Sequence, residues 1–265
     1  MQTLALTDLS AQNPHFLEAM RQGGFYVAIP EDCKPFLAEA VQFGNTLATN
    51  DKIKGAFRGY TGYHNPPNTQ AERFFVEREY WGTLLPQNMK GLAEKMDALA
   101  SQILLSALGA SGIPHEHWKE VTGGLLENTG WHHLSFNHYL PGKVADLGMP
   151  AHQDNGMLTV LFVEKVGLEV KRGDQWVDVP PKEGHFVVNF SYAFEQLVND
   201  PTKLTAVWHR VKKLDVERVS FGLFHDNGPD SQVLKHEGGK LHVVHPNFKE
   251  FVDQKFATAY ATQAK

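Results

Sequence analysis

The sequence predicts a mainly β fold with added helices: a two-sheet β-barrel such as a jelly roll, with helices packed on its outside. Short strand-like segments separated by Gly and Pro follow one another closely between residues 131 and 226, as in such barrels. Helical spacing of apolar residues is concentrated in the first half of the chain and near its end. The 265 residues, 42% of them hydrophobic, can bury one large shared core.

Residues 1–125 are expected to be mostly helical. Asn13 followed by Pro14 is typical of a helix start, because it combines an N-cap residue with a first-turn proline. The longest helix is expected from about residue 86 to 108, where apolar residues recur at helical spacing: Met89, Leu92, Met96, Leu99, Ile103 and Leu104. The other elements expected here are a short strand over 3–9, helices over 14–22 and 35–49, and a buried strand over 25–29.

The stretch from residue 51 to 81 differs from its surroundings. Its glycines and the Pro66-Pro67 pair argue against a long regular element, yet its aromatic content is high for a linker. Two interpretations remain open. The stretch is either a loop that its own aromatics pack against the core or a loop that covers a substrate, since long irregular segments in compact domains are often functional.

Residues 131–226 are expected to form the jelly-roll core of a single domain that spans residues 1–265. Residues 227–265 would then be a C-terminal segment that ends in a helix. Alternating or continuous apolar runs indicate the strands. The elements expected are strands over 134–140, 157–163, 167–170, 175–179, 185–190, 204–211 and 218–224, and a helix over 248–261.

Composition and charge narrow the possible partners. A net charge of −5 and a pI near 6.3 argue against a nucleic-acid-binding protein, which needs a concentrated basic face. Cys33 is the single cysteine, so neither an intrachain disulfide nor a cysteine-based zinc site is expected. The first residues lack the pattern of a signal peptide, and no apolar run approaches the length of a membrane helix. We expect a cytoplasmic protein without nucleic-acid or membrane partners; its oligomeric state stays open.

The triplet His152-Gln153-Asp154, together with His209, has the composition of a metal site. Two imidazoles and one carboxylate are the ligands of the facial triad, which holds iron(II) and leaves its other positions open. On an extended strand His152 and Asp154 would share one face. The third ligand, His209, lies in the strand-like run 204–211.

The segment from Asn137 to Asp226 resembles the iron(II)- and 2-oxoglutarate-dependent dioxygenases of the isopenicillin N synthase type. Gly23-Gly24-Phe25-Tyr26-Val27 also resembles the opening strand of that family, so the resemblance covers most of the chain, with residues 51–81 the least matched. The pieces that carry it, in order, are Asn137-His138-Tyr139-Leu140-Pro141, His152-Gln153-Asp154, Gly167-Leu168-Glu169-Val170, Trp176-Val177-Asp178-Val179-Pro180-Pro181, Val187-Val188-Asn189, His209-Arg210-Val211 and Arg218-Val219-Ser220.

The resemblance implies a double-stranded β-helix, that is a distorted jelly roll, with iron(II) at the barrel mouth. His152, Asp154 and His209 would bind the metal, and 2-oxoglutarate and O₂ would take the three remaining positions. The distal carboxylate of 2-oxoglutarate would bind Arg218 and Ser220, which share one face of a strand, because a guanidinium offers a planar fork to a carboxylate. Tyr139 and Asn137 are further candidates for cosubstrate binding.

The implied reaction couples oxidative decarboxylation of 2-oxoglutarate to hydroxylation, desaturation or cyclisation of a small molecule. The resemblance places Phe194 and Phe224 at the substrate cavity. Arg58, Tyr60 and Arg73 of the irregular stretch are candidates for contact with an acidic or polar substrate.

Other functions remain open at this stage. An iron oxidase of the same fold that does not need 2-oxoglutarate would carry the same motif. A non-catalytic jelly-roll binding protein would not need three metal ligands and a carboxylate-binding pair. A zinc hydrolase is disfavoured because nothing in the motif supplies a general base near the metal.

Overall fold

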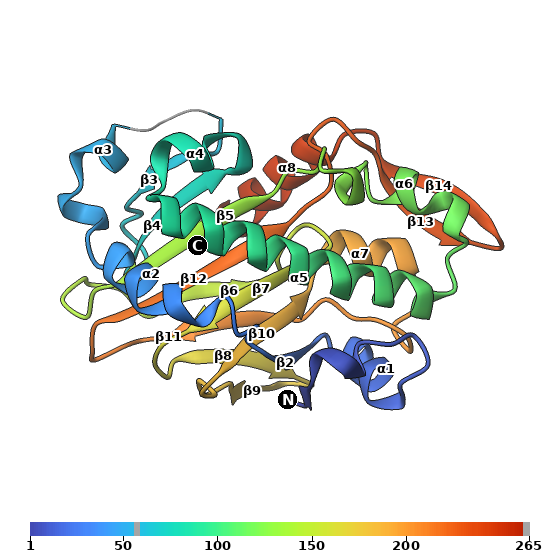
Figure 1. Ribbon diagram of the computed structural model, residues 1–265, viewed down its shortest axis with the longest axis horizontal. Coiled ribbons are helices and arrows are strands. Elements are labelled where there is room, and N and C mark those ends of the chain that lie inside the picture. The colour runs from blue at the N-terminus through green and yellow to red at the C-terminus, as the bar shows by residue number, and fades with distance from the viewer. Residues whose placement is uncertain (56–58, 262–265) are drawn as a thin grey trace.

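The computed structural model describes residues 1–55 and 59–261, with side chains up to residue 255, and consists of two facing β-sheets flanked by helices (Figure 1). The larger sheet has the strand order β1-β2-β10-β7-β12-β5-β4-β3, and the smaller has the order β6-β11-β8-β9. Strands β13 and β14 form a separate hairpin. The prediction of a jelly-roll barrel with outer helices is confirmed.

The strands of the larger sheet are β1 (Thr3–Leu4), β2 (Gly24–Ala28), β3 (Gly62–His64), β4 (Ala71–Glu77), β5 (His133–Tyr139), β7 (Leu158–Val163), β10 (His185–Phe190) and β12 (Arg218–His225). Those of the smaller sheet are β6 (Leu147–His152), β8 (Leu168–Arg172), β9 (Gln175–Asp178) and β11 (His209–Lys212). The hairpin consists of β13 (Val233–Glu237) and β14 (Lys240–His245).

The helices are α1 (Pro14–Arg21), α2 (Leu37–Gly44), α3 (Asp51–Lys54), α4 (Trp81–Leu84), α5 (Gln87–Ser111), α6 (Trp118–Val121), α7 (Tyr192–Val198) and α8 (Phe248–Ala261). Single 3₁₀ turns cover Leu6–Asp8, Lys34–Phe36, Leu47–Thr49, Arg78–Tyr80, His115–His117 and Leu125–Glu127. None of the helices in the described part of the chain is long and apolar enough to span a bilayer.

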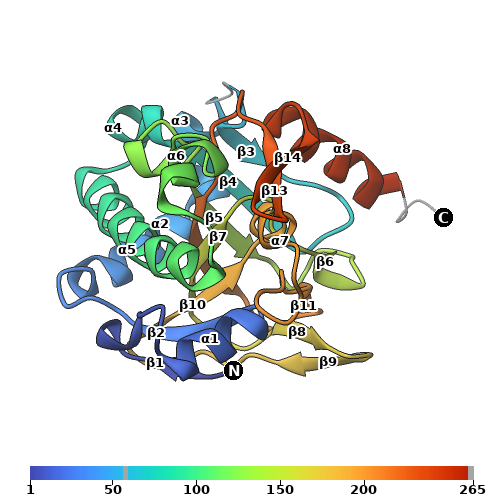
Figure 2. The ribbon, with the colours of Figure 1, turned by 90° about the vertical axis from the view of Figure 1, so that its right-hand side faces the viewer.

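The two faces of the larger sheet have different partners. Figure 2 shows this sheet between α5 on one side and β6, β8 and β11 on the other. On the helix side, Phe221 and Leu223 of β12 are fully buried in the main core, and Val219 of the same strand is fully buried as well. Helix α2 approaches β12 so closely that a Cβ at Gly44 would lie 2.6 Å from a methyl carbon of Val219. On the opposite face, apolar residues of both sheets form a second cluster that fills the barrel interior: Tyr26, Val163, Leu168, Val170, Val179, Val187 and Val207.

Several sequence-based expectations for single elements were wrong. The irregular stretch contains β4, a seven-residue strand that pairs with β3 on one side and with β5 on the other. Together with β3 it makes the N-terminal part less helical than expected. The expected helix over 35–49 is interrupted, since α2 ends at Gly44. The run before His209 is not a strand, so the third ligand begins β11.

Other elements were predicted correctly or missed altogether. Helix α8 has the expected bounds, and α1 and α5 differ from expectation by a few residues. Strand β6 was missed because Pro150 and Gly148 interrupt its pattern, and α7 was missed because it is short. The hairpin β13–β14 was also missed: its second strand is largely exposed and carries little apolar signal.

A buried polar network connects α5 with the larger sheet. Asp97 of α5 lies 2.6 Å from His132 Nδ1 and 3.2 Å from His225 Nδ1, and its other oxygen lies 3.2 Å from Arg78 Nη1. Asp97, His132 and His225 have side chains of the kind that bind metals and could in principle hold a metal ion. However, the 2.6 Å contact between His132 and Asp97 is a hydrogen bond. Two atoms that bind one metal at about 2.1 Å each lie roughly 3 Å apart, which is farther than this. In addition, Arg78 already neutralises the carboxylate. We interpret the group as structural.

Replacement of Asp97 with alanine should lower the free energy of unfolding by about 2–4 kcal/mol, because it leaves buried polar partners unpaired. Urea denaturation measures this. Glu94→Ala is the matched control: Glu94 lies on the same helix, 54% exposed, in a surface ion pair with Lys90, and surface pairs contribute at most about 1 kcal/mol. Equal effects of the two substitutions would contradict the structural role.

Two buried histidines, His225 of this network and His133 beside it, should also make stability depend on pH. Burial lowers the pKa of His225 to about 4 and that of His133 likewise to about 4, from an ordinary 6.5. Below pH 6.5 these two histidines therefore bind protons in the unfolded chain but stay neutral in the folded chain. The free energy of unfolding falls as the pH drops from about 6.5 to about 4. We expect a loss on the order of 1–3 kcal/mol, given about 1.4 kcal/mol per pKa unit and coupling between the groups. Denaturation in urea at a series of pH values tests this; a flat profile would contradict it.

Candidate iron and 2-oxoglutarate site

His152, Asp154 and His209 lie together at one end of the barrel. Their ligand atoms all lie within 4.8 Å of one another. Asp154 Oδ1 is 3.7 Å from His152 Nε2 and 3.6 Å from His209 Nε2. His209 pairs with His152 across the two strands β11 and β6, whereas Asp154 lies beyond the end of β6. The fold thus provides the neighbouring strand that the sequence analysis required, although Asp154 itself is in a loop.

Each of these side chains is oriented by a second contact. His152 Nδ1 lies 2.8 Å from the Pro150 carbonyl, and His209 Nδ1 lies 3.2 Å from the Val207 carbonyl. Both Nδ1 atoms therefore carry the proton, and both Nε2 lone pairs point to the cluster, as metal binding requires. Burial and the neighbouring His209 lower the pKa of His152 to about 4, which keeps it neutral near pH 7. The set fits iron(II).

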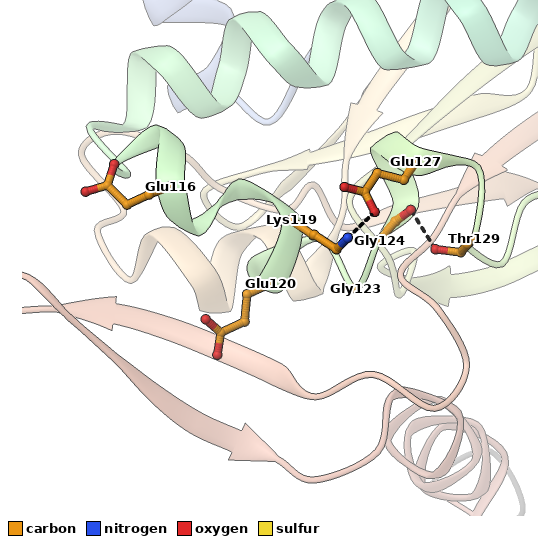
Figure 3. Close-up of a pocket in the computed structure, with 7 residues that line it drawn as sticks. All are labelled: Glu116, Lys119, Glu120, Gly123, Gly124, Glu127 and Thr129. Carbon is orange, nitrogen blue, oxygen red and sulfur yellow. Dashed lines mark hydrogen bonds and ion pairs between the residues drawn. The ribbon is translucent and has the colours of Figure 1, made fainter.

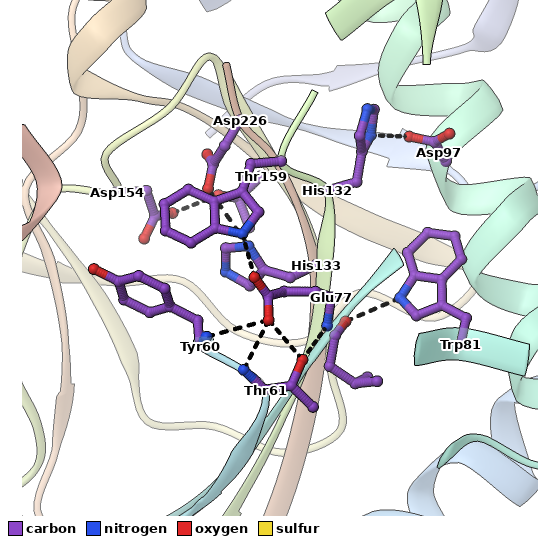
Figure 4. A network of polar contacts seen from close by, with 12 residues as sticks. Tyr60, Thr61, Glu77, Trp81, Asp97, His132, His133, Asp154, Thr159 and Asp226 are labelled. Atoms are coloured by element: carbon purple, nitrogen blue, oxygen red, sulfur yellow. Dashed lines mark hydrogen bonds and ion pairs between the residues drawn. The ribbon is translucent and has the colours of Figure 1, made fainter. Parts of the chain in front are cut away.

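The loop that carries Asp154 is fixed by the start of α7 and by Asp226. Thr159 Oγ1 donates a 2.7 Å hydrogen bond to Asp154 Oδ2, which leaves Oδ1 for a metal (Figure 4). The backbone N–H of Tyr192 donates to the Asp154 carbonyl at 2.9 Å. Asp226 is buried beside this loop, and burial together with the negative charge of Asp154 raises its pKa well above the ordinary value. Sequence analysis missed Thr159 and Asp226, because only the fold brings them to the triad.

Gly156 makes this close packing possible, since a Cβ there would lie 1.7 Å from Asp226 Oδ1. Gly156→Ala should displace either Asp226 or the Asp154 loop and so weaken iron(II) binding by about 10- to 100-fold, the usual effect of disturbing the groups that orient metal ligands. Metal titration under anaerobic conditions measures it. Gly142→Ala is the control, since a Cβ there would meet nothing within 4 Å. Unchanged affinity in Gly156→Ala would contradict this role of Gly156.

Arg218, Ser220, Asn137 and Tyr139 share one face of the larger sheet. Arg218 is opposite Tyr139 and Ser220 is opposite Asn137 in the pairing of β12 with β5. The side chains of β12 alternate, so this face is opposite to the one that packs on α5. Arg218 and Ser220 are each 1% exposed. The structure thus brings together the four residues expected to bind the cosubstrate.

Arg218 is a buried cation with no carboxylate within ion-pair distance in the described part of the chain, although the charge of Glu164 acts on it. Its Nε donates to the Lys165 carbonyl at 3.0 Å, and its guanidinium carbon lies 4.8 Å from the centre of the Tyr139 ring. Its Nη1 has no hydrogen-bond partner among the described residues. Burial lowers the pKa of Arg218, although Tyr139 opposes this, and a buried charge of this kind is costly until an anion pairs with it. A carboxylate of 2-oxoglutarate fits this position.

Comparison with known proteins agrees with this arrangement. Residues 131–227, which include the triad and Arg218, match the family model of the 2OG-Fe(II) oxygenase superfamily. Over this segment the chain is similar to the 2OG-Fe(II) oxygenase superfamily. A 1-aminocyclopropane-1-carboxylate oxidase from Diospyros kaki is 33% identical over 176 residues, which cover 64% of this chain and 52% of that protein. The chain spans about half the length of the curated relatives it matches.

Solved structures share the fold of this chain across almost its whole length. T7H from Neurospora crassa in complex with alpha-KG aligns with a TM-score of 0.76 over 96% of this chain and 95% of that chain, at 17% identity. JOX2 in complex with 2OG, Fe and JA aligns with a TM-score of 0.78 over 96% of this chain and 84% of that chain, at 21% identity. At these identities the likeness establishes the fold.

A cavity of about 540 Å³ opens beside β3 and β4. Its walls are Tyr60, Tyr63, His64, Asn65, Pro66, Arg73 and Phe75. Phe75 lies edge-on to His133 at 5.8 Å, and His133 stacks on Phe224 at 4.6 Å. The charge of Arg73 acts on His152, and that of Asp154 acts on His133. A row of aromatic rings therefore leads from this cavity towards the triad.

The remaining candidates for substrate contact have different positions. Phe194 is fully buried in the main core, 6.0 Å from the Phe190 ring, so the expectation that it faces the cavity was wrong. Its place on α7 turns it inwards, and no sequence pattern had indicated that helix. Arg58 lies outside the described residues. Tyr60 does line the cavity, and its N–H bonds to Glu77, which also accepts from Thr61 and from Trp131 (Figure 4).

A second hollow, of about 580 Å³, lies at α6 (Figure 3). Glu116, Glu120 and Glu127 line it, and Lys119 forms a 2.7 Å ion pair with Glu127. It contains none of the triad or cosubstrate candidates. We assign it no role in the reaction.

Proposed function

We propose that this protein is a non-haem iron(II) oxygenase that couples oxidative decarboxylation of 2-oxoglutarate to hydroxylation, desaturation or cyclisation of a small molecule. The observation that carries the proposal is the combination of two features in one barrel. One is the His₂-Asp cluster with both Nε2 atoms directed inwards; the other is the unpaired, buried guanidinium of Arg218.

The residues divide the work between metal, cosubstrate and substrate. His152, Asp154 and His209 would hold iron(II) on one face and leave the opposite positions free. Arg218 would pair with the distal carboxylate of 2-oxoglutarate, with Ser220, Tyr139 and Asn137 beside it. When bound, iron(II) and 2-oxoglutarate would activate O₂ for attack on the substrate and would yield succinate and carbon dioxide. The apolar barrel interior would exclude water from this chemistry.

The cavity beside β4 is the proposed substrate site. Tyr60, which precedes β4, and Arg73, which belongs to β4, line this cavity. The stacked rings of His133 and Phe224 would extend the substrate site from the cavity to the metal. A volume of about 540 Å³ is within the usual range for small-molecule sites. Contacts between a substrate and the two residues Tyr60 and Arg73 would make residues 59–77 a fixed wall of the site.

An anaerobic absorption experiment tests the proposal. The protein is loaded with iron(II), 2-oxoglutarate is added, and the visible difference spectrum is recorded. Chelation of a 2-oxo acid by iron(II) gives a metal-to-ligand charge-transfer band, so we expect this band to appear and to saturate with 2-oxoglutarate.

The other outcomes separate the alternatives. If iron(II) binds and oxygen uptake occurs without 2-oxoglutarate, the protein is an iron oxidase of the same fold. If iron(II) binds but neither the band nor any oxygen uptake appears, the proposal fails. If iron(II) does not bind at all, the interpretation of the triad is wrong, and a non-catalytic binding protein takes its place.

A further inference from the structure

Helix α8 docks beside the proposed iron site through contacts on two sides. Phe251 stacks on Tyr192 with ring centres 5.7 Å apart and planes 3° from parallel. Asp253 accepts a hydrogen bond from the Tyr60 hydroxyl. Since Tyr60 lines the proposed substrate cavity and the N–H of Tyr192 bonds to the Asp154 carbonyl, α8 connects the substrate cavity with the metal loop.

One turn beyond Phe251, α8 places the ammonium group of Lys255 over the ring of Tyr192. Its Nζ lies 3.7 Å from the centre of the Tyr192 ring, is shielded from solvent, and has no hydrogen-bond partner among the described residues. Burial lowers the pKa of Lys255 to about 8, although the charges of Asp154 and Glu195 raise it. A desolvated ammonium costs several kcal/mol, and contact with one aromatic ring returns about 2 kcal/mol of that.

Among the residues that the structure describes, no carboxylate lies within ion-pair distance of this ammonium, although the charges of Asp154 and Glu195 act on it. Glu195 is already held by the backbone N–H of Ala206 at 2.7 Å. Asp154 is proposed to bind a divalent cation, which would take up its negative charge. The distal carboxylate of 2-oxoglutarate would pair with Arg218, and its other carboxylate belongs at the metal. An anion for Lys255 therefore has to come from another molecule.

We propose that the substrate is a small organic acid, and that Lys255 binds its carboxylate between α8 and the metal loop. This inference rests on the proposed oxygenase function and adds the substrate class to it. Charge-assisted hydrogen bonds from the ammonium would fix the acid, and the aromatic walls formed by Tyr60 and Phe75 would hold its apolar part. Arg73 in the same cavity makes the approach to the metal more positive.

Binding of paired probes tests this inference without turnover. The probes are benzoate, phenylacetate and 3-phenylpropanoate, each compared with its primary amide, which has a similar shape but no charge. Equilibrium dialysis against the iron(II)- and 2-oxoglutarate-loaded protein is carried out without oxygen. The proteins compared are the parent, Lys255→Gln, Lys255→Arg and Lys249→Gln; Lys249 is a more exposed lysine of the same helix, paired with Asp253 at 2.8 Å.

We expect at least one acid to bind at least ten-fold more tightly than its amide to the parent protein. Lys255→Gln should remove this preference, whereas Lys255→Arg and Lys249→Gln should retain it. The amides should bind all four proteins equally, since their binding depends on the aromatic walls alone. A thermal unfolding scan of each variant verifies that α8 remains folded.

Three results would overturn the inference. The first is that no acid binds more tightly than its amide; the second is that the preference survives in Lys255→Gln. The third is that Lys255→Gln weakens the binding of 2-oxoglutarate, which would mean that the ammonium binds the cosubstrate. The charge-transfer band with 2-oxoglutarate tests the oxygenase function separately, so the band can form while the acid preference fails.

Discussion

Asp154→Ala should reduce iron(II) affinity by more than about 100-fold and abolish 2-oxoglutarate turnover. Disturbing only the groups that orient metal ligands already lowers affinity by about 10- to 100-fold, and this change removes a ligand. It also removes the single negative charge that the three ligand side chains offer to a dication. Anaerobic metal titration and succinate release measure the two effects.

Asp146→Asn is the matched control, because Asp146 is an exposed carboxylate shortly before β6. It should leave iron affinity unchanged. Thermal unfolding of metal-free Asp154→Ala should show a folded protein, since Asp154 lies in a loop and its removal leaves only Thr159 without its acceptor. If folded Asp154→Ala bound iron(II) as the parent does, the metal would have to lie elsewhere.

Arg218→Met should weaken 2-oxoglutarate binding by about 2–5 kcal/mol, which is roughly 30-fold to several thousand-fold. The reason is that the carboxylate would enter a buried site without its cation. The saturation curve of the charge-transfer band at rising 2-oxoglutarate concentration gives this affinity. Arg218→Lys keeps the charge but loses the planar fork, so its affinity should lie between the two.

Arg218→Met should weaken 2-oxoglutarate binding without lowering the stability of the ligand-free protein. In the ligand-free protein Arg218 is a buried charge without a carboxylate, and replacing such a charge with a well-packed apolar side chain is often neutral or stabilising. Ligand-free Arg218→Met should therefore unfold at the same temperature as the parent or higher. A loss of stability together with normal 2-oxoglutarate binding would mean that Arg218 is structural.

The sequence alone was sufficient for the fold class and for the chemical identity of the site. Strand-like segments between residues 131 and 226 predicted the barrel, because alternation of apolar residues is a local property of each strand. His152, Asp154 and His209 were identifiable because so few residue types bind iron. Arg218 and Ser220 could be paired in advance, since residues two apart on a strand share a face.

Packing decided what local patterns could not. Strand β4 is a strand because β3 and β5 pair with it on both sides, although the glycines and prolines around it predict a loop. Phe194 and Phe224 are the same residue type, yet one is buried in the core and the other stacks on His133. The difference depends on the direction of each side chain, which α7 sets for Phe194 and strand β12 sets for Phe224.

The sequence by itself predicted the class of fold, and its resemblance to a known family predicted three metal ligands and a cation for the cosubstrate. Only the pairing of that cation, Arg218, with Ser220 follows from short-range spacing, because residues two apart on a strand share a face. The tertiary structure alone decided which distant side chains surround them. Lys255 is 101 positions from Asp154 (255 − 154), and no periodicity connects the two. Its burial over Tyr192 arises only when α8 docks, because desolvation of a charge depends on all the atoms packed around it.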